Sequence, residues 1–539
     1  MNPASSNPPE SGSSEKVGHP YRSWDGSGQF DVIVIGSGIG ALATAALLAK
    51  RAGRRVLVLE RHYVAGGYTH VFKRTGYEWD VGLHYVGQFH QAGSQLGQLL
   101  ADVTDHQLAW APMGDVYDRI LIGGQAYDFV AGRDRFRQTL RQSFPAESSA
   151  IDKYLYRVES CVRASRLFFA EKALPPLLAL LAGPLLRASF LRGARVTTAQ
   201  MLEGLTRNRQ LIGVLTGQWG DYGLPPAQSS FAIHATIVDH YLEGAAYPVG
   251  GASRIAAAIV PVIERAGGRV LLNAEVAQIV VEGRRAVGVA MADGRVIRAP
   301  AVVSGIGVAN TFDRLLPPLV AERYRLPAKL RAVEPSLAHV NLYVGLRHSD
   351  QELGLTTTNL WVHPGPDHDR NLAAYLADSA GPLPYVYISF PSAKDPTFAQ
   401  RYPGRATLQL IAPARYDWFL PWQDAPWKRR GESYETLKQT FVDRLLAVLY
   451  EHVPSVRGKV DHAELSTPLS TRHFTGHAQG EPYGLAHTPA RFALRFLQPR
   501  TPIRHLYLTG QDVAVCGIAG GLVSGVLTAS SMLGRNLFK

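Results

Sequence analysis

The chain has 539 residues, of which 46% are hydrophobic and 19% are charged. This composition excludes a disordered polymer and predicts a globular protein with a sizeable core, in about two to four domains of roughly 150 residues each. The formal net charge of +12 and the pI near 9.6 favour an acidic partner surface. No aromatic and basic module with recognition spacing occurs, so we expect no nucleic-acid partner.

The first 29 residues differ in composition from the rest. Ser, Pro, Gly and Asn dominate the stretch MNPASSNPPESGSSEKVGHP, which predicts a disordered leader over residues 1–29. It contains no apolar core of the kind that a secretory signal needs. Cys161 and Cys516 are too few for a disulfide framework and lack metal-ligand spacing, so we expect a reducing, cytoplasmic location and no metal site.

A strand, a glycine turn and a helix follow the leader. Residues 30–35 form an apolar run that leads directly into Gly36, Gly38 and Ala41, a G-x-G-x-x-A pattern that also contains Gly40. Gly36 permits a tight turn, Gly38 lets the backbone approach a pyrophosphate, and the small Ala41 lets the next helix pack on the sheet. The helix expected over residues 41–51 directs its free N–H groups toward that phosphate.

A second strand, over residues 55–59, ends in Glu60, with Arg61 next. A carboxylate at this point accepts hydrogen bonds from an adenosine ribose and disfavours a 2'-phosphate, so FAD or NAD fits better than NADP. An ordinary glycine turn with a surface glutamate is the alternative. Against it, strand, turn, helix, strand and acid all occur in the order that dinucleotide binding requires.

Two further segments favour FAD over NAD. Gly66 and Gly67 form a second close-approach loop shortly after the acid. A strand-like HLYLT and a helix of small residues near the other end of the chain suit the ribityl chain and ring of an extended FAD. There Asp512 is expected to bond a ribityl hydroxyl. The other cofactor candidates in this segment are Gly510, Gly517 and Ile518.

The stretch between the two flavin segments divides by pattern. Residues 115–246 show apolar residues at helical spacing, and residues 317–500 alternate strand-like runs with loops, as a substrate-binding sheet would. Residues 173–186 form an uncharged apolar run flanked by Lys172, Arg187, Arg192 and Arg195. It is short for a span, and Pro175, Pro176 and Pro184 are expected to break a single helix. We expect residues 173–195 to insert shallowly into a membrane, or else to form a buried hairpin that lines a substrate tunnel.

Three more segments carry a family resemblance: GYEWDVGLHYVG at residues 76–87, AYPVGGASRIAAAI at 246–259 and GEPYGLAHTPARF at 480–492. With the two flavin segments, the chain resembles the retinol saturase and carotenoid isomerase branch of the flavin-dependent amine oxidase and phytoene desaturase superfamily. The resemblance implies an α/β protein with a discontinuous Rossmann-type FAD domain, an α+β substrate domain and a helical region. It also implies that the backbone of Val276 reads the adenine edge. The FAD domain is expected to comprise residues 30–114, 247–316 and 501–539.

The resemblance implies an FAD-dependent oxidoreductase that acts on a carbon–carbon double bond of an apolar polyene, a retinoid, carotenoid or related isoprenoid. Saturation would need a hydride from reduced flavin and a proton from the protein. The proton-donor candidates are His84, Tyr85, Tyr483 and His487, each of which has packing or cofactor contact as its alternative role.

Polyene isomerisation, desaturation and a flavin-free lipid carrier of the dissociation-inhibitor type are the competing hypotheses. The electron donor is open between NAD(P)H, another redox protein and a quinone, because SGIGVAN at residues 304–310 is not a complete second nucleotide motif. The sequence does not indicate an oligomeric state.

Overall fold

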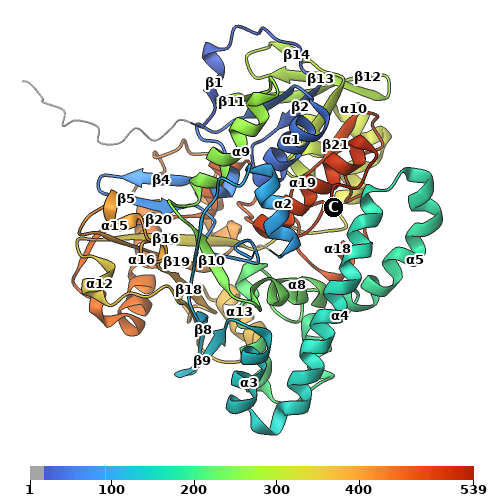
Figure 1. The fold of residues 1–539 in the computed structure, drawn as a ribbon. Helices are drawn as coiled ribbons and strands as arrows, with labels where there is room; N and C mark the ends of the chain where they lie inside the picture. The colour runs from blue at the N-terminus through green and yellow to red at the C-terminus, as the bar shows by residue number, and fades with distance from the viewer. Residues whose placement is uncertain (1–16, 92, 539) are drawn as a thin grey trace, which may run out of the picture.

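The structure, a computed structural model, describes residues 17–91 and 93–538. Six strands from distant parts of the chain form one sheet in which every neighbouring pair is parallel (Figure 1). Its order is β1 (His19–Pro20), β11 (Arg269–Leu272), β3 (Val56–Glu60), β2 (Val32–Ile35), β15 (Ala301–Ser304) and β21 (Leu506–Leu508). Parallel neighbours need crossovers, so this sheet joins segments that the sequence separates widely. The predicted Rossmann-type α/β fold is confirmed.

Successive residues of the central strand face two different cores. Val32 and Val34 pack into a cluster with the helices, whereas Ile33 and Ile35 pack into a cluster on the opposite face. The helical face is covered by α1 (Ile39–Ala52), α9 (Ser253–Arg265) and α19 (Gly517–Leu533). The other face is covered by the antiparallel strands β12 (Val276–Glu282), β13 (Arg285–Met291) and β14 (Val296–Arg298). An apolar strand covered on both sides is the reason that β2 reads as a continuous hydrophobic run.

The expected leader is wrong in its second half. Residues 1–16 lie outside the described residues, but β1 pairs in parallel with β11, with His19 opposite Leu271. Tyr21 and Trp24 are buried in the same core as Ile33. The aromatic residues that follow the Ser- and Pro-rich stretch therefore hold this segment against the sheet edge, and composition averaged over 29 residues conceals them.

A second, seven-stranded sheet lies beside the first. Its order is β20 (Val460–Ser466), β16 (Ala338–Leu346), β19 (Ala406–Ala414), β18 (Val386–Ser389), β17 (Asn359–His363), β8 (Val116–Ile122) and β9 (Gln125–Val130). α16 (Glu432–His452) packs on one of its faces. The strands β8 and β9 come from the region expected to be mainly helical. From Asp118 to Ile122 the residues of β8 alternate between buried and part-exposed positions with the period of a strand.

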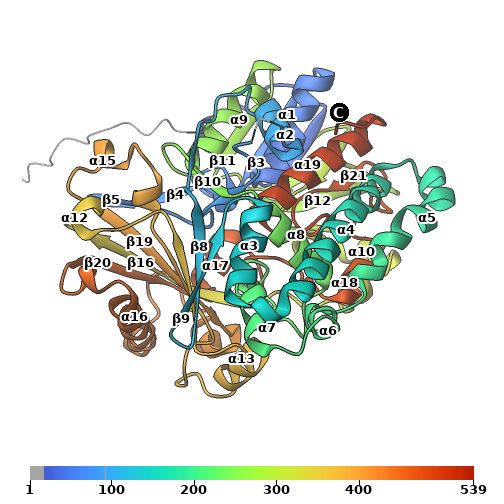
Figure 2. The same ribbon diagram turned by 60° about the horizontal axis from the view of Figure 1, so that its bottom comes forward.

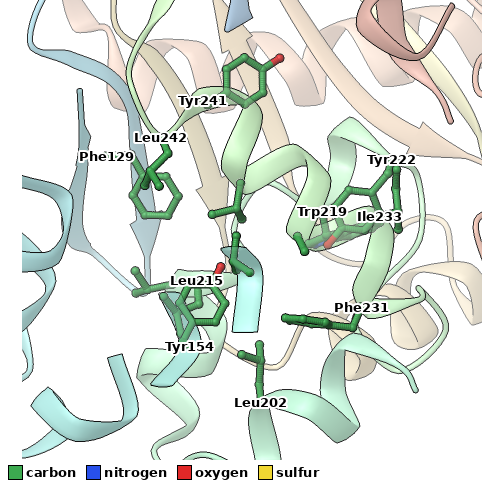
Figure 3. Close-up of a cluster of buried hydrophobic side chains, with 14 of the residues drawn as sticks. Phe129, Tyr154, Leu202, Leu215, Trp219, Tyr222, Phe231, Ile233, Tyr241 and Leu242 are labelled. Atoms are coloured by element: carbon green, nitrogen blue, oxygen red, sulfur yellow. The ribbon is translucent and has the colours of Figure 1, made fainter. Parts of the chain in front are cut away.

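Helices build the third layer, at the lower right in Figure 1. The largest are α3 (Arg133–Ser143), α4 (Ser148–Ala173), α5 (Pro176–Ala194) and α8 (Phe231–Tyr241). Figure 3 shows the core that fixes them, in which Tyr154 of α4 and Phe231 of α8 pack with Phe129 of β9 and with Trp219. Both ribbon views show α5 at the outer edge of the molecule (Figure 2).

The helix α5 runs unbroken across Pro184, contrary to expectation. Pro175 and Pro176 stand at its N-terminal end, where a missing backbone N–H costs no intrahelical hydrogen bond. Pro184 removes one hydrogen bond from the middle of the helix, which does not outweigh the packing of α5 against α4.

Shorter elements connect these layers. The strands are β4 (Val71–Arg74) with β5 (Tyr77–Asp80), and β6 (Val86–Gly87) and β7 (Trp110–Pro112) on either side of β10 (Ala245–Pro248). The remaining α-helices are α2 (Gln95–Val103), α6 (Thr198–Glu203), α7 (Arg209–Leu215), α10 (Pro318–Arg323), α11 (Leu326–Leu330), α12 (Asp350–Leu353), α13 (His368–Ala377), α14 (Pro391–Lys394), α15 (Phe398–Arg401), α17 (Pro468–Thr475) and α18 (Pro489–Ala493).

Candidate cofactor and substrate site

A single cavity of about 1320 Å³ connects the parallel sheet with the seven-stranded sheet. It begins at the carboxyl ends of β2, β3 and β15, where Ile35, Glu60 and Gly305 border it. Pockets for one small ligand measure roughly 300–1,000 Å³. The volume is therefore large enough for two ligands that meet in one continuous space.

The far wall of the cavity is one face of β16. Val340, Leu342 and Val344 point into the core under α16, whereas His339 and Tyr343 border the cavity. Around them, aromatic side chains from several elements form what we call the aromatic chamber. Its rings are Tyr85, Trp361, Tyr385, Tyr387 and Tyr483.

The near end, which we call the cofactor cradle, is made by the glycine turn and the two segments that approach it. Gly36 adopts a φ of +90°, which L side chains rarely take, and Gly38 caps α1 without any side-chain hydrogen bond to the first turn. The first amides of α1 therefore remain available to a ligand. A methyl group added at Gly38 would meet no atom within 4 Å, whereas one at Gly40 would lie 2.9 Å from the Gly521 carbonyl oxygen.

These contacts fit a pyrophosphate cradle. Gly36, Gly38 and Gly40 all border the cavity, and the space beside Gly38 is what a phosphate group would take. Ala41 is buried and does not border the cavity; a methyl group added at Gly305 would come within 2.8 Å of its Cβ. Its small size thus serves helix-to-sheet packing, as the motif predicts.

Glu60 ties the cradle together from the end of β3. Its Oε2 accepts hydrogen bonds from the Ser37 amide at 2.8 Å and the Ser37 hydroxyl at 2.6 Å, and its Oε1 accepts one from the His62 amide. Ser37 in turn accepts a bond from the Gly66 amide at 3.0 Å. Gly67 packs so closely that a methyl group added there would lie 2.9 Å from the Gly38 Cα.

The other expected cradle residues divide into two groups. Arg61 borders the cavity and donates hydrogen bonds to the carbonyls of His473 and Phe474 at the end of α17. Asp512 is buried away from the cavity, where its carboxylate accepts hydrogen bonds from the Val308 and Leu485 amides at 2.8 and 3.0 Å. It holds loops together rather than facing a ligand. In addition to Arg61, the candidates that border the cavity are Val276, Gly510, Gly517 and Ile518.

Three of the four proton-donor candidates border the cavity, namely His84, Tyr85 and Tyr483. His487 does not. It is buried, and its Nε2 accepts a hydrogen bond from the Cys516 amide at 3.0 Å. Burial also lowers the pKa of His487 well below its usual value, so the ring is neutral.

The remaining candidates differ in protonation. Burial, assisted by the Lys394 charge, lowers the pKa of His84 to about 3, so His84 is not an imidazolium at neutral pH. Burial raises the pKa of Tyr483 well above 10, so Tyr483 keeps its hydroxyl proton. Burial raises the pKa of Tyr85 in the same way. The Tyr85 hydroxyl lies 2.9 Å from Asp118 Oδ2 and 3.0 Å from Asp221 Oδ2.

Comparison with known proteins identifies the family of this chain. Residues 42–533 match the family described as flavin containing amine oxidoreductase. The chain belongs to this family. As a member of this family it is an oxidoreductase that uses FAD. The family explains why one cavity holds both a dinucleotide cradle and a chamber for a second ligand.

Individual relatives of this flavin containing amine oxidoreductase agree. It is 38% identical to the all-trans-retinol 13,14-reductase of Rattus norvegicus, over 95% of this chain and 86% of the relative. It is 26% identical to the lycopene-forming phytoene desaturase of a Paracoccus strain, over 93% and 97%. A putrescine oxidase with bound putrescine shares the fold, with a TM-score of 0.61 and 18% identity over 94% of this chain and 99% of that one.

Sequence reasoning missed three polar residues at the chamber: Asp221, which borders the cavity, and Asp118 and Lys394, which are buried behind it. Lys394 is buried, and its Nζ donates hydrogen bonds to the His84 carbonyl, to Ser389 Oγ and to Asn359 Oδ1. One signal was available. Asp118 occupies an inward position of β8, in phase with the buried Ile120 and Ile122, and an acid in such a position requires partners.

Proposed function

We propose that the protein saturates one double bond of an apolar polyene of the retinoid class. The observation that carries this proposal is the continuous cavity, which runs from the cofactor cradle into the aromatic chamber. The reductase name of a relative that is 38% identical over 95% of the chain supports the same substrate class. Rings that are stacked and tilted against one another offer apolar faces on which a flat conjugated chain can pack.

Different residues of the chain would bind the cofactor and align the substrate. Gly36, Gly38 and Gly40 would hold the pyrophosphate and Glu60 the adenosine ribose, and reduced FAD supplies a hydride when it is bound. Tyr85, Trp361 and the other rings of the aromatic chamber align the polyene and exclude water. Exclusion of water is needed because the same chamber must direct one proton to one carbon.

The test is anaerobic. The bound flavin is reduced completely, all-trans-retinol is added, and the product is analysed by mass. A gain of two hydrogens together with reoxidation of the flavin is the expected result. Unchanged mass with altered chromatographic retention would instead establish isomerisation and overturn saturation.

Desaturation is the second candidate, because the phytoene desaturase relative aligns over 93% of the chain. It requires oxidised flavin and removes two hydrogens, so the same chamber would be tested with oxidised protein and a more saturated polyene. A lipid carrier without redox chemistry is disfavoured by the complete cradle around Gly38 and by the family match.

We also propose that α5 inserts shallowly into a membrane. Among the described residues it is the one helix that is long and apolar enough to span, by length and composition. Its outer face exposes Leu177, Leu180, Leu181 and Leu185, the last at 82%. Its inner face packs on the protein through Gly183, Phe190 and Ala194. Held along one side, the helix suits insertion in the plane of a leaflet rather than crossing.

Fewer exposed cationic side chains surround α5 than the sequence suggested. Lys172 turns inward and donates hydrogen bonds to the Leu497 and Val513 carbonyls, and burial lowers its pKa to about 7. Arg187 pairs with Glu171 at 3.1 Å. Arg192 and Arg195 remain exposed to meet anionic lipid.

The cavity reaches the surface beside this helix. Leu167 of α4 borders the cavity and is 53% exposed, and α4 packs on α5. A polyene dissolved in a leaflet would thus enter the chamber without crossing water. The buried-hairpin alternative fits α4, which contributes to the cavity wall, but it does not fit the exposed leucines of α5.

Vesicle flotation tests the membrane contact. The double variant Leu181→Glu/Leu185→Glu should bind anionic vesicles about tenfold or more weakly, a loss of about 1.4 kcal/mol, because two charges replace inserted side chains. Leu319→Glu on α10 is the matched control, since Leu319 is also 82% exposed but belongs to another surface. Equal loss in both variants, or no loss in the double variant, would contradict insertion through α5.

A further inference from the structure

The Tyr85 hydroxyl lies between two buried carboxyls. It is 2.9 Å from Asp118 Oδ2 and 3.0 Å from Asp221 Oδ2, both within hydrogen-bond distance. A tyrosine hydroxyl has one proton and donates to only one of them. The second contact is a hydrogen bond only if the other carboxyl carries a proton of its own.

Asp118 is the acceptor of the pair. Its Oδ2 accepts a hydrogen bond from the Gln218 amide at 2.6 Å and its Oδ1 one from the Asn359 amide at 2.8 Å. The orientation of Asn359 is fixed, because Lys394 donates to its Oδ1 and thereby turns its NH₂ group toward Asp118. A carboxyl that receives donors on both oxygens is stabilised as the anion.

Asp221 is placed differently. Within residues 17–91 and 93–538, the only hydrogen bond of its carboxyl is the one with Tyr85. Burial raises its pKa well above the usual value, and the charge of Asp118 adds to that rise. Burial raises the pKa of Asp118 as well, but there Asn359 and Gln218 oppose the rise. The shared proton therefore resides on Asp221, which donates to Tyr85, and Tyr85 donates to Asp118.

Only the protonated member of the pair faces the substrate space. Asp221 borders the cavity, whereas Asp118 lies behind it. The backbone carbonyl of Asp221 is 3.7 Å from the Cys516 Sγ, and Gly517 at the start of α19 follows. The carboxyl thus lies where the aromatic chamber meets the cofactor cradle.

The other titratable groups around the pair are uncharged rings and the Cys516 thiol, whose pKa burial raises to about 12, apart from one cation. Tyr85 stacks on Tyr241 with ring centres 4.3 Å apart, and Lys394 lies 5.7 Å from the Tyr85 ring centre. Burial lowers the pKa of Lys394 to about 7, against the attraction of Asp118 and Asp80. The phenols near Asp221, all protonated, are Tyr85, Tyr222, Tyr241, Tyr385, Tyr387 and Tyr483.

We propose that Asp221 is the acid that protonates the alkene, and that Tyr85 and Asp118 position and recharge it. This inference rests on the proposed saturation. The O–H bond of Asp221 breaks and a C–H bond forms with the π-electron pair at one alkene carbon. The neighbouring carbon takes the hydride that reduced FAD supplies. Asp221 is left as a carboxylate beside anionic Asp118, and this repulsion draws a proton back from water.

The main test replaces Asp221 by its neutral isostere. In Asp221→Asn, single-turnover reoxidation of reduced flavin by all-trans-retinol should slow about 10²- to 10⁴-fold, the usual contribution of a general acid. Flavin content and its absorbance spectrum should be unchanged. The control is Asp239→Asn, which removes another cavity-facing carboxyl that is hydrogen-bonded to Gln88 and should retain the wild-type rate. A fast Asp221→Asn variant would overturn the proposal.

Infrared difference spectroscopy provides a readout without turnover. At neutral pH, wild type minus Asp221→Asn should show the carbonyl stretch of a protonated carboxylic acid; a carboxylate band in its place would refute the assignment. Tyr85→Phe keeps the acid but removes its partner, so that band should shift and the reaction should slow less than in Asp221→Asn. The Tyr85→Phe spectrum tests the proposal even if Asp221→Asn does not fold, and an unshifted band would overturn the role of Tyr85.

The two proposals fail in distinguishable ways. If wild-type protein with fully reduced flavin leaves the mass of retinol unchanged, saturation fails while the infrared result still stands. If wild type saturates retinol and Asp221→Asn does so at the same rate, only the assignment of the acid fails.

Discussion

The cofactor cradle and the aromatic chamber occupy opposite ends of one cavity, and they are built from different parts of the chain. The cradle is made of backbone: Gly38 presents amides, and at Gly40 and Gly67 an added methyl group would lie within 3 Å of a neighbouring segment's backbone. The chamber is made of side chains, behind which Asp118 and Lys394 are buried. A backbone site tolerates changes of pH but not of volume. A site of buried ionisable groups is sensitive to pH and less sensitive to changes of volume.

The largest expected effect is on stability, and it comes from a buried acid outside the cavity that interacts with the charge of Lys394. Asp80 is fully buried, and burial raises its pKa to about 7 despite hydrogen bonds from Tyr247 and the Ala252 amide. Because the folded state binds this proton more tightly than the unfolded state, the wild type loses stability as pH rises from about 4 to about 7. Relative to Asp80→Asn the loss should approach roughly 4 kcal/mol. Denaturant unfolding of both proteins at pH 5 and pH 8 measures the part of this loss that falls between those two values, about 2.6 kcal/mol, and a pH-independent difference would contradict the buried acid.

The second-largest expected effect is on FAD binding, and it comes from added side-chain volume in the cofactor cradle. Gly38→Val adds a side chain where no protein atom lies within 4 Å, so the apoprotein should fold with an unchanged Tm. The added methyl groups would take the space of the pyrophosphate, and FAD binding should weaken about 100-fold, or about 2.7 kcal/mol. Flavin fluorescence titration of the apoprotein measures this loss. Gly204→Ala, at an ordinary helix end, is the control; a Gly38→Val protein with full flavin content would refute the assignment of the cradle.

The smallest effect sharpens the contrast within the cradle. Ser37→Ala removes the 2.6 Å hydrogen bond to Glu60 and the acceptor for the Gly66 amide, but leaves the bond from the Ser37 amide. Hydrogen bonds to charged groups contribute about 1.5–3 kcal/mol, and part of this is recovered because Glu60 keeps two amide donors. We expect FAD affinity to fall about tenfold, with little change in pH dependence. A loss as large as that of Gly38→Val would show that side chains dominate the cradle after all.

The same contrast explains which features could be predicted from sequence. Gly36, Gly38 and Glu60 follow from spacing, since a dinucleotide requires these residue types at these intervals along neighbouring strands. The resemblance identified Tyr85 but not its role, because its partner Asp221 lies 136 positions away. It also pointed to His487, although no motif reveals that the ring turns away from the cavity. Burial, which no sequence motif reveals, likewise determines the roles of Asp512 and Lys172.

The discontinuous parallel sheet has a consequence for biosynthesis. Gly36 leaves the ribosome early, but Gly517 and the α19 turn that closes the cradle follow about 480 residues later, on the order of a minute at 5–20 residues per second. Until then the apolar faces of β2 and α1 lack the helix α19 that covers them, and β15 lacks its partner strand β21. Exposed apolar surface of this kind is prone to aggregation, so we expect nascent chains of this protein to need protection until α19 has been made.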